Sequence, residues 1–273
     1  MLVKKNYTSP TARVYTAYDV DVPPKHPGPG WTRFVCVSDT HSRKYKVPPG
    51  DVLLHSGDLS SWGYLSQLEA SLRWIQSLPH PIKVIVAGNH DLCLDERCAE
   101  GGEWEKVVGD AVPVKDIEAA QARVRDEAAC QAGIHYLEYQ SVNVTTAAGR
   151  TWEVYGSPAA PKYAHGAFQY KSGSPEAEEV YSQIPPTTEI LLTHTPPHGI
   201  CDTTRKGVKA GCPALASKLA SGDLNRLRLH VFGHIHEAHG AEVQPASATN
   251  VQRIYVNAAV PNSLLPTIVD LLD

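Results

Sequence analysis

Residues 32–42, Thr-Arg-Phe-Val-Cys-Val-Ser-Asp-Thr-His-Ser, combine an apolar run with two side chains that commonly bind metals. The run from Phe34 to Val37 predicts a strand, and Asp39 and His41 follow where it turns. Alternate residues at a strand end project to the same side, so Asp39 and His41 can point at one ion while Thr40 turns away. The segment therefore predicts a metal-binding loop at the carboxyl end of a strand.

Four further clusters of potential ligands occur along the chain, and most of them also follow short apolar runs. They are Gly57-Asp58, Gly88-Asn89-His90-Asp91, Thr193-His194 and Gly233-His234-Ile235-His236. Divalent cations accept the carboxylate, amide and imidazole ligands that these clusters supply. A carboxylate such as Asp58 can bridge two cations about 3.5–4 Å apart, the spacing of two-metal hydrolases. If the fold brings these loops together, the sequence predicts a two-metal hydrolase.

Each cluster by itself has a plainer interpretation. A single histidine after a strand is more often a hydrogen-bonded structural residue, and an Asn-His-Asp run can simply form a turn. Five such clusters at strand ends in one chain are hard to obtain by chance. Their joint occurrence favours the dinuclear site.

The composition is that of an ordinary globular enzyme. Of 273 residues, 42% are hydrophobic and 20% are charged, and the net charge of -4 argues against general nucleic-acid binding. No apolar run approaches the roughly 18 residues of a membrane span, and no apolar segment follows Lys4 and Lys5 as a secretory signal would require. We therefore expect a cytoplasmic protein in which the close pairs Cys93/Cys98 and Cys201/Cys212 stay reduced.

The chain divides into a proline-rich lead-in, residues 1–30, and a single domain, residues 31–273. Helices are expected at 65–78, where Ser60 or Ser61 could cap the start, and at about 114–132. Strands are expected at 34–37, 52–55, 83–87, 134–139, 142–146, 152–155, 189–192, 229–232 and 254–257, with an edge strand near 14–18. Residues 156–187 lack periodicity, and a loop of that length is usually a substrate rim or lid. About ten strands in mixed order favour two packed α/β sheets with helices outside.

The order Asp-x-His, Gly-Asp, Gly-Asn-His-Asp, His and Gly-His-x-His resembles the calcineurin-like metallophosphoesterase superfamily. Residues 32–42, Tyr155-Gly156-Ser157-Pro158 and the run from Leu192 to Pro197 are similar to the brain-239 type of metallophosphoesterase-domain proteins. Those proteins are related to class III cyclic nucleotide phosphodiesterases. The resemblance implies the metallo-dependent phosphatase fold, a four-layer α-β-β-α sandwich of two mixed sheets flanked by helices.

The resemblance also implies a role for each ligand position. One ion would be held by Asp39, His41 and His236, the other by Asn89, His194 and His234, and Asp58 would bridge them. His90 would be the catalytic imidazole, and Asp91 would orient it. The two divalent ions could be Mn, Fe, Zn, Ni, Co or Mg.

The function expected from this site is hydrolysis of a small-molecule phosphodiester, such as a cyclic nucleotide, by a metal-bridging hydroxide. Two alternatives stay open: the same site repurposed for a non-phosphate substrate in a biosynthetic pathway, and a non-catalytic binding scaffold. A protein phosphatase of the superfamily typically carries Asp-Arg-Gly after the second motif, whereas this chain has Leu59-Ser60-Ser61-Trp62-Gly63 there. Aromatic residues that could stack on a nucleobase, or could instead be satellite core, are Trp62, Tyr64, Tyr163, His165, Phe168 and Tyr170. The role of His198 and the oligomeric state stay open.

Overall fold

The first apolar run forms strand β4 (Trp31–Val37), in which every residue after Trp31 is buried. It pairs in parallel with β5 (Val52–His55). The strands β6 (Ile82–Ile85) and β7 (Ile134–Tyr136) follow in this order, and each pairs in parallel with the strand before it. A strand covered on both faces needs apolar side chains at successive positions, and these runs supply them. Parallel pairing places the carboxyl ends of neighbouring strands at one edge of the sheet.

The computed structural model describes residues 1–3, 5–100, 111–247, 251–261 and 265–273. Within these ranges the chain forms two seven-stranded sheets. The first has the order β1 (Leu2–Val3), β14 (Gly240–Gln244), β15 (Arg253–Asn257), β13 (Leu229–Phe232), β12 (Ile190–Thr193), β9 (Thr151–Ser157) and β8 (Gln140–Thr145). The second has the order β2 (Asn6–Thr8), β3 (Ala12–Tyr15), β16 (Thr267–Leu272), β4, β5, β6 and β7.

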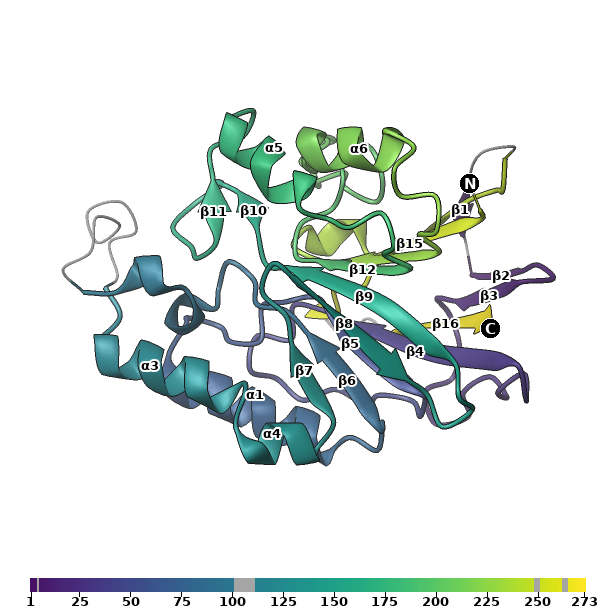
Figure 1. Ribbon diagram of the computed structural model, residues 1–273, viewed down its shortest axis with the longest axis horizontal. Helices are drawn as coiled ribbons and strands as arrows, with labels where there is room; N and C mark the ends of the chain where they lie inside the picture. The colour runs from purple at the N-terminus through teal and green to yellow at the C-terminus, as the bar shows by residue number, and fades with distance from the viewer. Residues whose placement is uncertain (4, 101–110, 248–250, 262–264) are drawn as a thin grey trace.

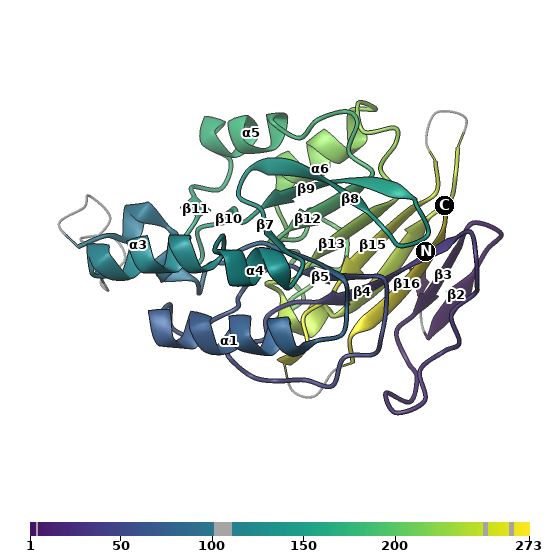
Figure 2. The ribbon, with the colours of Figure 1, turned by 60° about the horizontal axis from the view of Figure 1, so that its bottom comes forward.

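Helices cover the outer faces of both sheets (Figures 1 and 2). The second sheet packs against α1 (Leu65–Ser77), α3 (Val114–Arg123) and α4 (Glu127–Gln131), and the first against α5 (Pro175–Ser182) and α6 (Pro213–Ala220). Between the sheets lies an apolar core with contributions from both, such as Phe34 and Trp152, whose rings meet edge to face at 5.4 Å. The predicted four-layer α-β-β-α sandwich is confirmed.

The lead-in contributes strands to both sheets. Strand β1 pairs with β14 of the first sheet, and β3 pairs with β16 of the second and carries β2 at its edge. The edge strand expected near residues 14–18 is the Ala12–Tyr15 strand, which is not itself the edge of the described sheet. Residues 23–30, where the prolines cluster, form no helix or strand.

Several elements differ from the sequence-based expectation. The helix expected at 114–132 is two helices, because Asp126 caps α4 by accepting a hydrogen bond from the Ala129 N–H. The segment 156–187 is not a structureless loop: it contains β10 (Ala160–Pro161), β11 (Gln169–Tyr170) and α5. The strands β14 and β16 and the helix α6 were not expected at all.

The structure also bears on the state of the cysteines and on membrane-spanning helices. All six cysteines are free, as expected for reduced thiols, and Cys36 is buried within β4. In the ranges that the structure describes, helices long and apolar enough to cross a bilayer are absent.

Candidate metal centre

A first group of ligand atoms meets beyond the carboxyl ends of β4, β5 and β13. Ligand atoms of Asp39, His41, Asp58 and His236 all lie within 4.8 Å of one another. The His236 Nε2 atom is 3.1 Å from Asp39 Oδ1 and 3.3 Å from His41 Nε2. His41 Nε2 is 3.8 Å from Asp58 Oδ2. Two carboxylates and two imidazoles therefore face one small volume, as the set expected for the first ion requires.

A second group meets beside it, beyond β6, β12 and β13. Asn89 Oδ1 lies 2.8 Å from His194 Nε2 and 2.8 Å from His234 Nδ1. Asp58 reaches this group as well, because its Oδ1 atom is 3.4 Å from His194 Nε2. The two oxygens of Asp58 thus face different groups, Oδ2 the first and Oδ1 the second. All seven predicted ligand residues lie together, with Asp58 between the two sets.

Backbone strain is concentrated at these ligands. Asp39, His41, Asp58 and His234 adopt left-handed φ angles of 56°, 46°, 54° and 68°. Such conformations cost a residue with a side chain about 1–3 kcal/mol and persist only where the surrounding structure enforces them. They turn the side chains abruptly off the strand ends towards a common point. Glycine at 88 and 233 leaves the space, because a Cβ there would overlap the Asp58 and Asp39 carboxylates respectively.

The protonation of His194 tests whether these residues fit a cation. Its Nδ1 atom is 2.9 Å from the Ser56 carbonyl oxygen, which can only accept, so Nδ1 carries the proton. Burial lowers the pKa of His194, so the ring is neutral and Nε2 presents a lone pair. That lone pair faces Asn89 Oδ1, another acceptor, at 2.8 Å. Two hydrogen-bond acceptors at this distance repel each other unless a positive charge lies between them. A divalent cation would supply that charge and bind both atoms.

Of the other histidine ligands, two are held in the neutral form that binds metals. Burial lowers the pKa of His41 to about 4 and that of His234 to about 3, so both imidazoles are neutral near neutral pH. For the third, His236, burial would lower the pKa, but the hydrogen bond to Asp39 raises it. For Asp39, burial alone would raise the pKa, but the hydrogen bond from His236 and the neighbouring histidines lower it. Burial, and then the charge of Asp39, raise the pKa of Asp58 well above its usual value. Two cations beside Asp58 would reverse that shift.

His90 lies at the margin of the first group, and its ring centroid is 4.7 Å from that of His41. Its expected partner was Asp91, but the structure gives it another: Nδ1 donates to the Ser61 carbonyl oxygen at 2.7 Å. The Asp91 carboxylate is fully buried and accepts from the N–H groups of Leu59, Ser60 and Gly88 and from the Ser60 hydroxyl. Asp91 therefore joins the Asp58 loop to the Asn89 loop, and the Ser61 carbonyl fixes the His90 ring.

Sequence reasoning missed Ser60 and Ser61, which it assigned to the start of α1. That helix begins after Tyr64 without a side-chain cap. Ser61 instead donates its hydroxyl proton to the His41 carbonyl oxygen at 2.6 Å, in addition to accepting from His90. A backbone acceptor leaves no signature in residue type, so the sequence carried no signal for the second contact.

The candidate rim aromatics separate into two kinds. Phe168 and Tyr170 are 3% and 2% exposed and belong to the cores beneath the helices, which is the plainer of the two interpretations. Trp62, Tyr64 and Tyr163 are exposed. Segment 156–187 does border the centre, because the Ala167 N–H donates to the Asn89 carbonyl oxygen at 2.8 Å. His198 is half-exposed, 3.8 Å from the Asp202 carboxylate.

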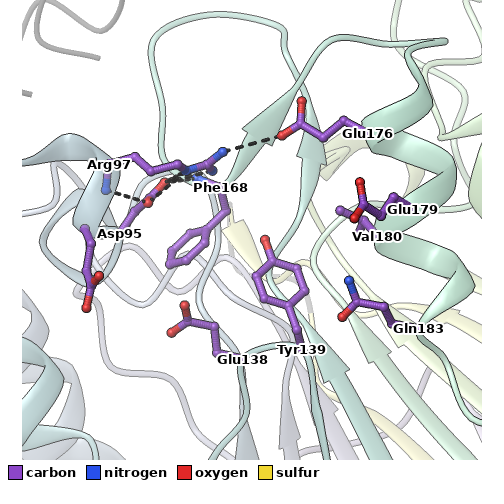
Figure 3. A pocket seen from close by; sticks show the side chains of 10 residues that line it. Asp95, Arg97, Glu138, Tyr139, Phe168, Glu176, Glu179, Val180 and Gln183 are labelled. Carbon is purple, nitrogen blue, oxygen red and sulfur yellow. Dashed lines mark hydrogen bonds and ion pairs between the residues drawn. The ribbon is translucent and has the colours of Figure 1, made fainter. Parts of the chain in front are cut away.

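A separate cavity of about 400 Å³ lies between η2 (Glu96–Cys98), the β7–β8 turn and α5 (Figure 3). None of the seven predicted ligands lines it. Its lining includes Asp95, Glu138, Glu176 and Glu179, and its one arginine, Arg97, already pairs with Asp95 at 3.0 Å and with Glu176 at 3.7 Å. This negative lining disfavours an anionic ligand in the cavity.

Comparisons with known proteins agree with this geometry. The family model for calcineurin-like phosphoesterases matches residues 32–238, the span that contains every predicted ligand. The chain therefore belongs to the calcineurin-like phosphoesterase family. A solved crystal structure superposes with a TM-score of 0.52 at 15% identity, covering 83% of this chain and 90% of the other, and supports the fold.

Curated relatives differ in length and name. The human metallophosphoesterase domain-containing protein 1 is 34% identical over 85% of this chain and 67% of its own length. A UPF0046 protein of Caenorhabditis elegans is 30% identical over 88% of this chain and 58% of its own. A probable rhamnogalacturonate lyase C of Emericella nidulans is 36% identical over 77% of this chain, but the matched region is 18% of that protein.

Proposed function

We propose that this protein is a phosphoesterase dependent on two divalent metal ions that hydrolyses small phosphodiesters, with cyclic nucleotides as the leading class. The observation that carries the proposal is the Asp58 carboxylate, whose two oxygens face two separate ligand groups at 3.8 and 3.4 Å. Two bound cations would neutralise phosphoryl oxygens and lower the pKa of a bound water molecule to about 7. A cytoplasmic location is proposed with it, supported by the free state of all six cysteines.

In this proposal each group of the chain has a defined task. Asp39, His41 and His236 would hold one cation, Asn89, His194 and His234 would hold the other, and Asp58 would contact both. The Ser61 carbonyl accepts the Nδ1 proton of His90, so the Nε2 atom is the one that can exchange a proton with the substrate. His90 then stabilises the phosphoryl oxygens or protonates the leaving alkoxide, an effect that is typically worth about 10²–10⁴-fold in rate.

The test is a comparison of wild-type protein with His90→Ala. We expect this variant to retain two ions per chain by elemental analysis but to lose about 10²–10⁴-fold in kcat on bis-p-nitrophenyl phosphate with Mn²⁺ added back. Undiminished turnover would show that His90 takes no part in the reaction. Asp58→Ala is the companion variant, since losing the shared carboxylate should reduce the metal content itself.

The outcome also separates the two alternatives. A protein that holds two ions but hydrolyses no cyclic or linear phosphodiester would indicate a site repurposed for another substrate. A protein that binds no Mn²⁺, Fe²⁺, Zn²⁺, Ni²⁺, Co²⁺ or Mg²⁺ would indicate a scaffold. Each ion is therefore added back separately to metal-free protein, before the ester screen.

A further inference from the structure

Trp62 places a large aromatic surface in solvent beside the metal centre. Its side chain is 67% exposed, and its ring centroid is 6.3 Å from that of His90 at an interplanar angle of 56°. The His90 ring is in turn 4.7 Å from the ring of the ligand His41. One side chain, that of His90, therefore lies between the exposed Trp62 ring and the ligand His41.

The turn that carries Trp62 is held in place on both sides. The Ser61 carbonyl accepts from His90 Nδ1, and the Trp62 N–H donates to Gln67 Oε1 of α1 at 2.8 Å. The Gly63 N–H donates to the Ser60 hydroxyl at 3.1 Å. Gly63 has a φ of +74°, and a Cβ at this position would overlap Leu92. These contacts hold the backbone of Trp62 in place, whereas its indole ring is exposed to solvent.

The exposed indole offers a flat apolar face to a ligand bound at the neighbouring centre. Tryptophan buries about 150–250 Å² when covered, and its flat face favours stacked rings. The polar half of a phosphoester belongs at the cations, so what reaches the indole is the ester's organic substituent. Stacking of a base on an aromatic side chain contributes about 1–3 kcal/mol, equivalent to roughly a 5- to 150-fold gain in affinity.

We propose that Trp62 is the specificity-determining residue of this site and selects phosphoesters whose substituent is a planar aromatic ring, a nucleobase above all. The inference rests on the proposed phosphoester function and narrows it to one class of substituent. Selection then acts on the ring of the substrate and not on a second anionic group.

The test compares two ligands that share a phosphate and a ribose. Calorimetry on Mn²⁺-loaded protein should show AMP binding at least about fivefold more tightly than ribose 5-phosphate. AMP, but not ribose 5-phosphate, should also quench the tryptophan fluorescence of the wild-type protein, and this quenching should be lost in Trp62→Phe. Equal affinities of the two ligands for wild-type protein would overturn the inference.

Three substitutions separate stacking from simple apolar contact. Trp62→Phe should keep most of the preference for AMP, whereas Trp62→Ala and Trp62→Leu should lose it. On a nucleoside ester, the Ala and Leu variants should show a higher KM with little change in kcat. Unchanged affinity for ribose 5-phosphate shows that each variant is folded with its centre intact. A Trp62→Ala variant that still prefers AMP would overturn the inference.

The two proposals fail separately. If the protein hydrolyses no phosphodiester yet shows the AMP preference and its loss in Trp62→Ala, the assigned reaction is wrong and the role of Trp62 stands. If it hydrolyses esters with and without a ring equally well, only the role of Trp62 is wrong.

Discussion

Asp91 illustrates how one buried carboxylate can hold two ligand-bearing loops together through their backbone N–H groups. Its two oxygens accept from three backbone N–H groups and one hydroxyl, all in the loops that carry Asp58 and Asn89. Burial raises the pKa of Asp91, although these donors act in the opposite direction. The residue therefore acts through the geometry of the two loops.

Asp91→Asn should destabilise the protein, because its amide nitrogen would face N–H donors and leave them without acceptors. A buried donor without a partner costs about 1–3 kcal/mol, so a loss of about 2–4 kcal/mol in the free energy of unfolding is expected from urea titration. Asp223→Ala, at a 58% exposed side chain, is the control and should leave the free energy of unfolding nearly unchanged. Equal effects of the two substitutions would contradict the role given to Asp91.

At the scale of elements, strand β16 is an example of a strand that the local sequence pattern does not predict. Its sequence, Thr-Ile-Val-Asp-Leu-Leu, contains a charged residue in a strand that is buried up to its last position. Asp270 is tolerated because it lies opposite Arg33 of β4, and the two form a bidentate pair at 2.7 and 2.9 Å. Arg33 also donates to the Pro24 carbonyl oxygen at 2.6 Å, which ties the lead-in to the sheet. The partner lies 237 residues away in sequence, so no local pattern identifies it.

Asp270→Ala should leave the Arg33 charge buried without a counter-ion and cost about 3–5 kcal/mol in the free energy of unfolding. The double variant Arg33→Met/Asp270→Leu should recover most of the lost free energy of unfolding. With both charges removed, neither has to be desolvated when the protein folds. The exposed pair of Arg123 and Glu69 is the matched control, and Arg123→Ala should cost less than about 1 kcal/mol. A mild effect of Asp270→Ala, similar to the control, would refute this account.

Helix α5 is an element whose signal was present in the sequence but overlooked. Ser174 stands at the cap position, Pro175 follows at the first helical position, and Glu176 and Glu178 lie in the first turn. Proline at that position and acidic residues near a helix start are both favourable. The aromatic and glycine content of the surrounding segment concealed this short helix, whose buried face is only Ala177 and Tyr181.

At the scale of the whole molecule, the centre exists because the carboxyl ends of strands from the two sheets lie side by side at one end of the sandwich. Asp39, Asp58 and Asn89 follow strands of one sheet, and His194 and His234 follow strands of the other. The sheets are linked at this end, where the His234 N–H donates to the Asp39 carboxylate at 3.0 Å and Ser38 pairs with Ala259 in a bridge. Packing of the sandwich therefore decides the spacing of the two ligand groups.

Buried histidines make the stability of the whole fold dependent on pH. Burial lowers the pKa of His80 to about 4 and that of His230 to about 3, below the value of about 6.5 expected in the unfolded chain. The unfolded chain therefore binds protons first, and stability is present above about pH 6.5 and falls as the pH drops towards 4. Each such histidine should contribute about 1.4 kcal/mol per pH unit within that window.

The measurement is a series of urea titrations of metal-free protein between about pH 7 and about pH 4.5. His230→Gln should give a shallower loss of stability with acid, by about one proton, than the wild-type protein. An identical pH slope in the two proteins would show that His230 does not titrate on unfolding.

The sequence by itself identified the candidate ligands, because apolar runs that end in Asp, Asn and His mark strands and their turning points locally. The class of fold followed from the resemblance that these motifs carry. Only the tertiary structure decided which atoms face one another: Asp58 between the two groups, Ser61 instead of Asp91 against His90, and Asp270 against Arg33. Those contacts join residues that are distant in the chain or use backbone atoms common to every residue. Residue type therefore cannot encode them, and the packing of one sheet on the other does.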